Sequence, residues 1–134
     1  VSMKKVLTKR TDIVYPELSY QIIGSAFDVY NTIGNGHPEK YYQRALAESF
    51  EKRSIKFQEQ VFAPLKYETK IIGRSFFDFL VENKIIVEIK KTERFSKTNI
   101  DQVVGYLKTS NLHLAILINF GNDGVKFRRI VNLY

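Results

Sequence analysis

The sequence predicts an α/β domain of the mixed α+β type, in which helices flank a mixed β-sheet. Two observations come first: apolar residues recur at helical spacing in the first third of the chain, and the periodicity changes to alternation from about residue 55. The third is a further helical segment between later strands, which is typical of a crossover between parallel strands, whereas short turns join antiparallel ones. The expected order of elements is ααββββαββ.

Two helices are expected before the strands. The first begins at Pro16 and ends at the segment TIGNG, residues 32–36, because Gly and Asn accept the positive φ that terminates helices. Pro38 suits the first turn of the second helix. The expected stripes are Ile23, Phe27 and Tyr30, flanked by Ile22, Ala26 and Val29, in the first helix, and Tyr42, Ala45, Leu46 and Phe50 in the second.

The remaining elements follow from turn residues and β-formers. Strands are expected at 56–63, 65–72, 74–82 and 84–91, and later at 112–120 and 125–132. Between these two groups a helix is expected at 99–110, with Thr98 or Ser96 as its N-cap.

Length, charge and composition limit the function. The 134 residues predict one domain over 1–134, with 1–14 a partly flexible N-terminal segment. Apolar runs are far shorter than the ~20 residues that span a bilayer, so no membrane partner is expected. The absence of cysteine and of a secretory signal fits a cytoplasmic protein. A net charge of +7 favours a polyanionic partner such as nucleic acid.

One hairpin holds the candidate chemistry, within FFDFLVENKIIVEIKK at residues 76–91. A three-residue turn at 82–84 places Asp78 directly opposite Glu88, and Lys90 shares their face. Phe76, Leu80 and Ile86 are expected on that acid face as well. The core face is expected to carry Phe77, Phe79, Val81, Val87 and Ile89.

The electrostatic repulsion between the paired acids needs compensation. Two unit charges ~5 Å apart repel by roughly 3 kcal/mol at an effective dielectric near ~20. Lys90, protonation of one acid, or a bound divalent cation would each offset this repulsion. Mg²⁺ and Mn²⁺ favour such oxygen ligands, and a cation beside a lysine suits phosphodiester hydrolysis. The hairpin taken alone favours the alternative of a local salt bridge between Lys90 and either acid on a strand face.

The motifs together resemble a known superfamily. Asp78, Glu88 and Lys90 form the pattern D-x9-E-x-K, which resembles the core signature of the PD-(D/E)XK nucleases, although the proline that precedes the acid is absent. The spacing of Gly36, Glu39 and Tyr42 is similar to the GxxExxY branch of that superfamily. Two further stretches also resemble its members: Gln102-x-x-x-Tyr106, as in recombination-exonuclease-type nucleases, and the tail at 114–132.

The resemblance implies a restriction-endonuclease-like core and a set of roles. Asp78 and Glu88 would bind Mg²⁺ or Mn²⁺, with Glu39 completing the site, and Lys90 would be the catalytic amine. Gln102 and Tyr106 would line the active site, while a structural role is expected for Tyr42. Where the branch commonly carries a leucine pair, this chain has His37 and Pro38, a difference that alters the loop and leaves Glu39 in place.

The expected function is metal-dependent hydrolysis of nucleic acid, with DNA favoured over RNA on superfamily grounds alone. Two alternatives are open: a nucleic-acid-binding module that keeps the fold without turnover, and an interaction protein that forms a homodimer or binds a partner protein. Basic residues near the site would neutralise phosphates. They are Lys40, Arg44, Lys91, Arg94 and Lys97.

Overall fold

The computed structural model describes residues 14–92 and 95–133. Its helices are α2 (Pro16–Ile33), α3 (Glu39–Lys52) and α4 (Lys97–Ser110), and its strands are β1 (Phe57–Tyr67), β2 (Lys70–Val81), β3 (Ile85–Lys90), β4 (Leu114–Gly121) and β5 (Gly124–Val131). Residues 1–13 of the segment expected to be flexible lie outside this description. No helix of the described ranges is long and apolar enough to cross a bilayer.

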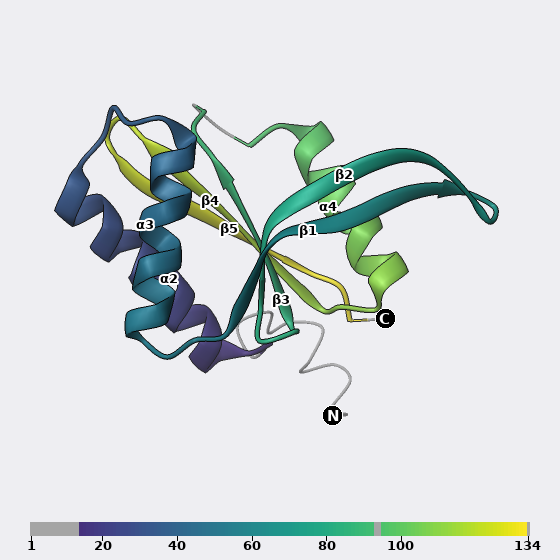
Figure 1. The fold of residues 1–134 in the computed structure, drawn as a ribbon, viewed down its shortest axis with the longest axis horizontal. Helices are drawn as coiled ribbons and strands as arrows, with labels where there is room; N and C mark the ends of the chain where they lie inside the picture. Colours follow the sequence, from purple (N-terminus) through teal and green to yellow (C-terminus); the bar gives the residue numbers. More distant parts are fainter. Residues whose placement is uncertain (1–13, 93–94, 134) are drawn as a thin grey trace, which may run out of the picture.

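The sheet is mixed, as predicted. Its strands lie in the order β1-β2-β3-β4-β5, and only β3 and β4 run parallel (Figure 1). The crossover between these two contains α4, whose N-cap is Ser96: its hydroxyl accepts a hydrogen bond from the Asn99 backbone at 3.1 Å. The remaining neighbours are antiparallel, which fits the short turns between them.

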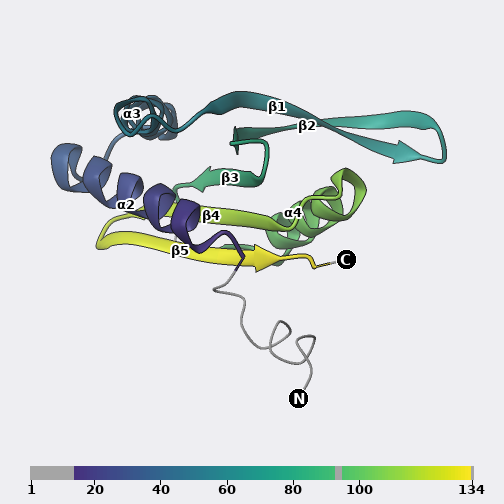
Figure 2. The same ribbon diagram turned by 90° about the horizontal axis from the view of Figure 1, so that it is seen from below.

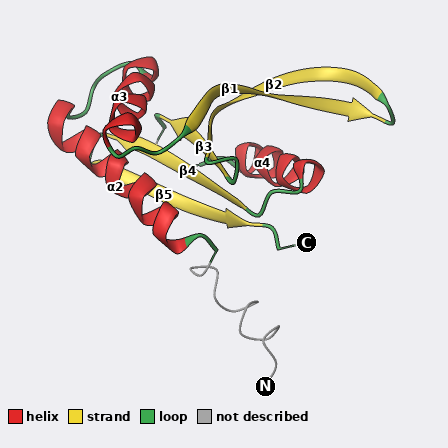
Figure 3. Cartoon of the chain, turned by 60° about the horizontal axis from the view of Figure 1, so that its bottom comes forward, coloured by secondary structure: helices red, strands yellow, loops and turns green. Residues whose placement is uncertain are grey.

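Helices cover both faces of the sheet. Alternate residues of β3 and β4 enter two separate apolar clusters, one packed against α2 and α3 and the other against α4. Figure 3 shows α2 and α3 on one side of the molecule and α4 on the other. The stripe of α2 is rotated from its expected centre: Ile22, Ala26 and Val29 are buried, whereas Phe27 is 40% exposed.

The prediction of four strands between residues 56 and 91 is wrong, because three are present. The expected break beside Pro64 does not occur, and β1 continues to Tyr67 before turning at Glu68. β1 is the edge strand, where half of the backbone N–H groups have no neighbour, so a proline is tolerated. The result is one long hairpin in place of two short strands.

The two faces of this hairpin change places at the point where it leaves the sheet. Gln60 has a positive φ of 51°, and the β1–β2 pairing skips Gln60 and Asp78. Beyond that point Phe77 packs with Ala63 against α4, so the expectation that Phe77 shares a face with Phe79 is wrong. We call residues 61–77 the arm. Figures 1 and 2 show it extending past the other strands beside α4.

Candidate active site

The turn between β2 and β3 sets the predicted register. Val81 pairs with Ile85, and Phe79 with Val87, which is the alignment that places Asp78 opposite Glu88. The turn is closed by the Lys84 backbone N–H, which donates to the Val81 carbonyl at 2.9 Å. Regular pairing ends at Phe79 and Val87, immediately before the acids.

Past this point the two carboxylates replace the backbone ladder. The Asp78 N–H donates to Oε1 of Glu88 at 3.1 Å, and the Ile89 N–H donates to Oδ2 of Asp78 at 2.7 Å. Gln60 donates to Oδ1 of Asp78 at 3.4 Å. Each acid is thus anchored to the opposite strand, and the oxygens are held at the place where the strands separate.

Lys90 and protonation of Glu88 both reduce the negative charge of the acid pair. The Lys90 amine lies 3.5 Å from Oε2 of Glu88, and both side chains are largely buried, with 25% and 14% of their surfaces exposed. Burial, and then the charge of Asp78, raises the pKa of Glu88 to about 8, while Lys90 opposes the shift. The ionised form of Glu88 is therefore disfavoured despite the nearby Lys90, and additional positive charge would stabilise it.

Glu39 lies at the start of α3, within electrostatic reach of the pair. Partial desolvation, and then the charge of Asp78, raises its pKa, although the residue as a whole is exposed. Gln43, one turn later, donates to Glu59 and accepts from Gln60, both at 3.2 Å, and so ties α3 to β1. Among the described residues, no three carboxylate or His side chains stand close enough together to hold a metal.

Tyr42 has a structural place beneath this helix start. It is fully buried and stacks on Phe120 with ring centroids 4.5 Å apart. Its hydroxyl donates to the Gly34 carbonyl at 2.6 Å and accepts from the His37 N–H at 3.5 Å. Tyr42 therefore fixes the loop that leads into Glu39.

Gln102 and Tyr106 lie apart from the acids, on the face of α4 that meets the arm. Gln102 donates to the Ser75 hydroxyl at 3.4 Å, and the Tyr106 ring packs against Phe77 with centroids 4.7 Å apart. Burial raises the pKa of Tyr106. No hydrogen bond recorded for the described residues joins Gln102 or Tyr106 to Asp78, Glu88 or Lys90.

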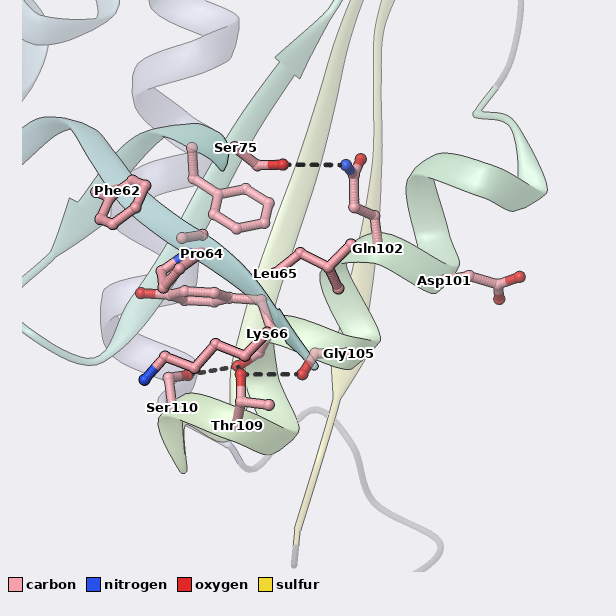
Figure 4. Close-up of a pocket in the computed structure, with 13 residues that line it drawn as sticks. Phe62, Pro64, Leu65, Lys66, Ser75, Asp101, Gln102, Gly105, Thr109 and Ser110 are labelled. Atoms are coloured by element: carbon pink, nitrogen blue, oxygen red, sulfur yellow. Dashed lines mark hydrogen bonds between the residues drawn. The ribbon is translucent and has the colours of Figure 1, made fainter. Parts of the chain in front are cut away.

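A cavity of about 550 Å³ opens between α4 and the arm (Figure 4). It was not foreseen, because it depends on how the unpredicted arm sits over α4. Its lining residues are Phe62, Ala63, Pro64, Leu65, Lys66, Ser75, Phe77, Asp101, Gln102, Gly105, Tyr106, Thr109 and Ser110.

The basic residues expected at the site have different surroundings. Lys40 and Arg44 are exposed on α3 and lie over the Tyr41 ring, 5.5 and 5.9 Å from its centroid. Lys97 pairs with Asp101 at 2.7 Å. Lys91 is exposed beyond the end of β3, and Arg94 lies outside the described residues.

Asn119 supports the site and was missed. It is buried in β4, pairs with Lys90 in the parallel ladder, and holds Thr92 by two bonds. The Thr92 N–H donates to its Oδ1 at 2.8 Å, and its Nδ2 donates to the Thr92 carbonyl. A signal was present in the sequence, since Asn119 is the single polar residue within LAILINF, 114–120.

We expect Asn119→Ala to lower the free energy of unfolding by about 2 kcal/mol, because two backbone groups of Thr92 lose their buried partners. Urea unfolding monitored by circular dichroism measures this. Asn122→Ala, at an exposed position in the β4–β5 turn, is the matched control and should change little. Equal losses in both variants would contradict the role of Asn119.

Gly105 interrupts α4 without a steric reason. A Cβ at this position would meet nothing within 4 Å, and the glycine faces the cavity. Glycine in a helix interior costs about 0.5–1 kcal/mol relative to alanine. Gly105→Ala is therefore expected to raise the free energy of unfolding by about that amount, as measured by urea titration. An unchanged or lower stability would mean that the site is not open.

Comparisons with known proteins give the family of the chain and a likeness in fold. Residues 16–130 match the family model of the PD-(D/E)XK nuclease superfamily. The fold is similar to the crystal structure of SSO0001, with a TM-score of 0.53 and 16% identity over 70% of this chain, which spans 50% of that structure. An alkaline exonuclease, LHK-Exo from Laribacter hongkongensis, aligns with a TM-score of 0.48 and 10% identity, covering 85% of this chain and 82% of that one. No curated protein matches the sequence.

Proposed function

The chain belongs to the PD-(D/E)XK nuclease superfamily, and from this premise we propose that it hydrolyses phosphodiester bonds of nucleic acid with a divalent cation. The observation that carries the proposal is the acid pair. Asp78 and Glu88 are anchored side by side at the end of regular pairing, and the pKa of Glu88 is raised to about 8. A cation suits this site, because it would stabilise the ionised form of Glu88 that burial and the charge of Asp78 disfavour.

The donor set fits Mg²⁺ or Mn²⁺. Both ions prefer carboxylate oxygens and leave several positions to water and phosphate, so a pair of acids is sufficient protein ligation. When bound, the cation would polarise a phosphate and stabilise developing negative charge. Asp78 and Glu88 would hold it. Glu39 does not stand close enough to the pair to share a metal with it directly in this structure, and it would complete the site as a third carboxylate from α3 if it moved toward the bound cation.

The other residues act on substrate and water. The Lys90 ammonium, 3.5 Å from Glu88, would orient the attacking water or stabilise the negative charge of the phosphate. Lys40, Arg44, Lys91, Arg94 and Lys97 would neutralise backbone phosphates, which makes binding salt-dependent. Gln102 and Tyr106 would meet the substrate from α4. DNA is the proposed substrate.

Within the superfamily, we propose that the chain belongs to the GxxExxY branch. Gly36 has a φ of 91°, which favours glycine, and the loop that it begins is held by the buried Tyr42. These two residues would position Glu39 between them. A partner protein or a second copy of the chain would supply further binding contacts to a long substrate.

Cleavage assays test the proposal. Labelled single- and double-stranded DNA and RNA are incubated with the protein and Mg²⁺, Mn²⁺ or chelator. Cleavage that requires the cation is expected. Salt-sensitive binding without cleavage under any of these conditions would contradict it and would favour a binding module.

A further inference from the structure

We infer that the cavity between the arm and α4 binds one unpaired nucleotide of the substrate strand, next to the position of cleavage. The inference rests on the proposed nuclease function and specifies its substrate class. The cavity of about 550 Å³ lies within the range of ~300–1,000 Å³ that is usual for small-ligand sites. A duplex is too wide for such a space, whereas a single base with its sugar is not.

Gly105 leaves the space open. Any larger residue at this point of α4 would project into the cavity, while a Cβ there would meet no protein atom within 4 Å. The helix therefore contains a residue of poor helix propensity where neither its backbone nor its packing requires one. Room for a ligand accounts for it.

The lining matches a nucleobase. Tyr106 is half-buried and packs against the buried Phe77 with ring centroids 4.7 Å apart, so its ring presents aromatic surface on which a base can stack. Gln102 and Ser75 supply an amide and a hydroxyl for the polar edge of the base, and their mutual hydrogen bond of 3.4 Å is long enough to be exchanged easily.

Charge also favours an anionic ligand. Lys66 lines the cavity and is exposed, so its amine is available to a phosphate. The carboxylate of Asp101 is paired with Lys97 at 2.7 Å, and in Figure 4 it points away from the arm. The acid among the lining residues is therefore paired with a cation and directed outward.

Along β2, the last residue that lines the cavity directly precedes the acid pair. Phe77 lines the cavity, and the next residue along β2 is Asp78. Consecutive strand residues are about 3.3 Å apart, which is less than the length of one nucleotide. A base in the cavity would thus place an adjoining phosphate near the acids. Single strands, ends and flaps meet this requirement, whereas a continuous duplex must first unpair a base.

The test uses the full chain carrying Glu88→Gln, so that binding is measured without cleavage. The probes are a short fluorescein-labelled thymidine homopolymer and a labelled duplex, at one ionic strength. Adding Gly105→Ala, Gly105→Leu or Gly105→Phe is expected to weaken single-strand binding in order of side-chain size, by about tenfold for phenylalanine. Duplex affinity, which depends on phosphates, is expected to stay constant. A correctly folded Gly105→Phe protein with full single-strand affinity would overturn the inference.

A second measurement does not depend on that variant. A fluorescent purine analogue within the homopolymer should lose emission on binding, because its base stacks on Tyr106. Unchanged emission at saturation would overturn the inference. Cleavage by the unsubstituted chain distinguishes the two proposals. Size-graded loss of binding without any metal-dependent cleavage would support the nucleotide site in the cavity and contradict the nuclease function. Metal-dependent cleavage together with full single-strand affinity of Gly105→Phe would support the nuclease function and contradict the nucleotide site.

Discussion

Replacing Glu88 by Gln is expected to reduce metal-dependent cleavage by at least about 100-fold while making the metal-free protein more stable at alkaline pH. The amide can still accept the Asp78 N–H but contributes no charge to a cation. Stability rises because the substitution removes a buried carboxylate that the folded protein ionises reluctantly. Activity and stability therefore change in opposite directions.

The raised pKa of Glu88 sets the sign of the effect of pH on stability. The pKa of Glu88 is raised from 4.5 to about 8, so the folded chain holds this proton more tightly than the unfolded chain does. Its contribution is most favourable below pH 4.5, declines between pH 4.5 and 8, and is least favourable above pH 8. The gain from Glu88→Gln should thus be largest above pH 8, by at least about 1 kcal/mol, and vanish in acid.

Thermal and urea unfolding across this pH range measure the effect. Glu48→Gln, an exposed substitution of the same kind on α3, is the matched control and should show neither change. A Glu88→Gln protein that is less stable than the unsubstituted one above pH 8 would mean that Glu88 is not under electrostatic strain.

Lys90→Met is expected to reduce cleavage by about 10²–10⁴-fold, the usual range for a lost acid–base or positioning group. Its effect on stability should be opposite to that of Glu88→Gln. Without the amine 3.5 Å away, Glu88 and Asp78 lose their positive neighbour. The free energy of unfolding should therefore fall, most strongly where Glu88 is ionised.

The same unfolding series checks this prediction, with Lys52→Met, at the exposed end of α3, as control. In the double variant Glu88→Gln/Lys90→Met the alkaline loss should shrink, because the repulsion that Lys90 offsets is no longer present. An alkaline loss of equal size in the single and double variants would show that Lys90 does not act through Glu88.

The hairpin at the centre of the site was predictable because its signals are local. Alternation, a turn of known length and two carboxylates on one face are enough to bring Asp78 and Glu88 together, and the observed register agrees. The cap at Ser96 and the end of α2 before Gly34 are local in the same sense. Each depends on a few neighbouring residues.

The arm and the cavity were not predictable because their causes lie far apart in the sequence. Gln60 reverses the faces of the hairpin because its φ is positive, and glutamine is not a residue type that predicts a positive φ. Phe77 consequently packs on α4, and Gln102 meets Ser75 rather than the acids. Helical spacing placed Gln102 and Tyr106 on one face correctly, but it contained no information about what would lie opposite.

The most direct test of the central claim is calorimetric titration of Mn²⁺ into the unsubstituted protein and Glu88→Gln, below pH 8, in buffers of different ionisation enthalpy. If the acid pair holds the cation, Mn²⁺ must displace the proton of Glu88, so the heat will depend on the buffer. We predict binding with proton release in the unsubstituted protein, and affinity at least about tenfold weaker without that release in Glu88→Gln. Equal affinity and equal proton release in the two proteins would contradict the account.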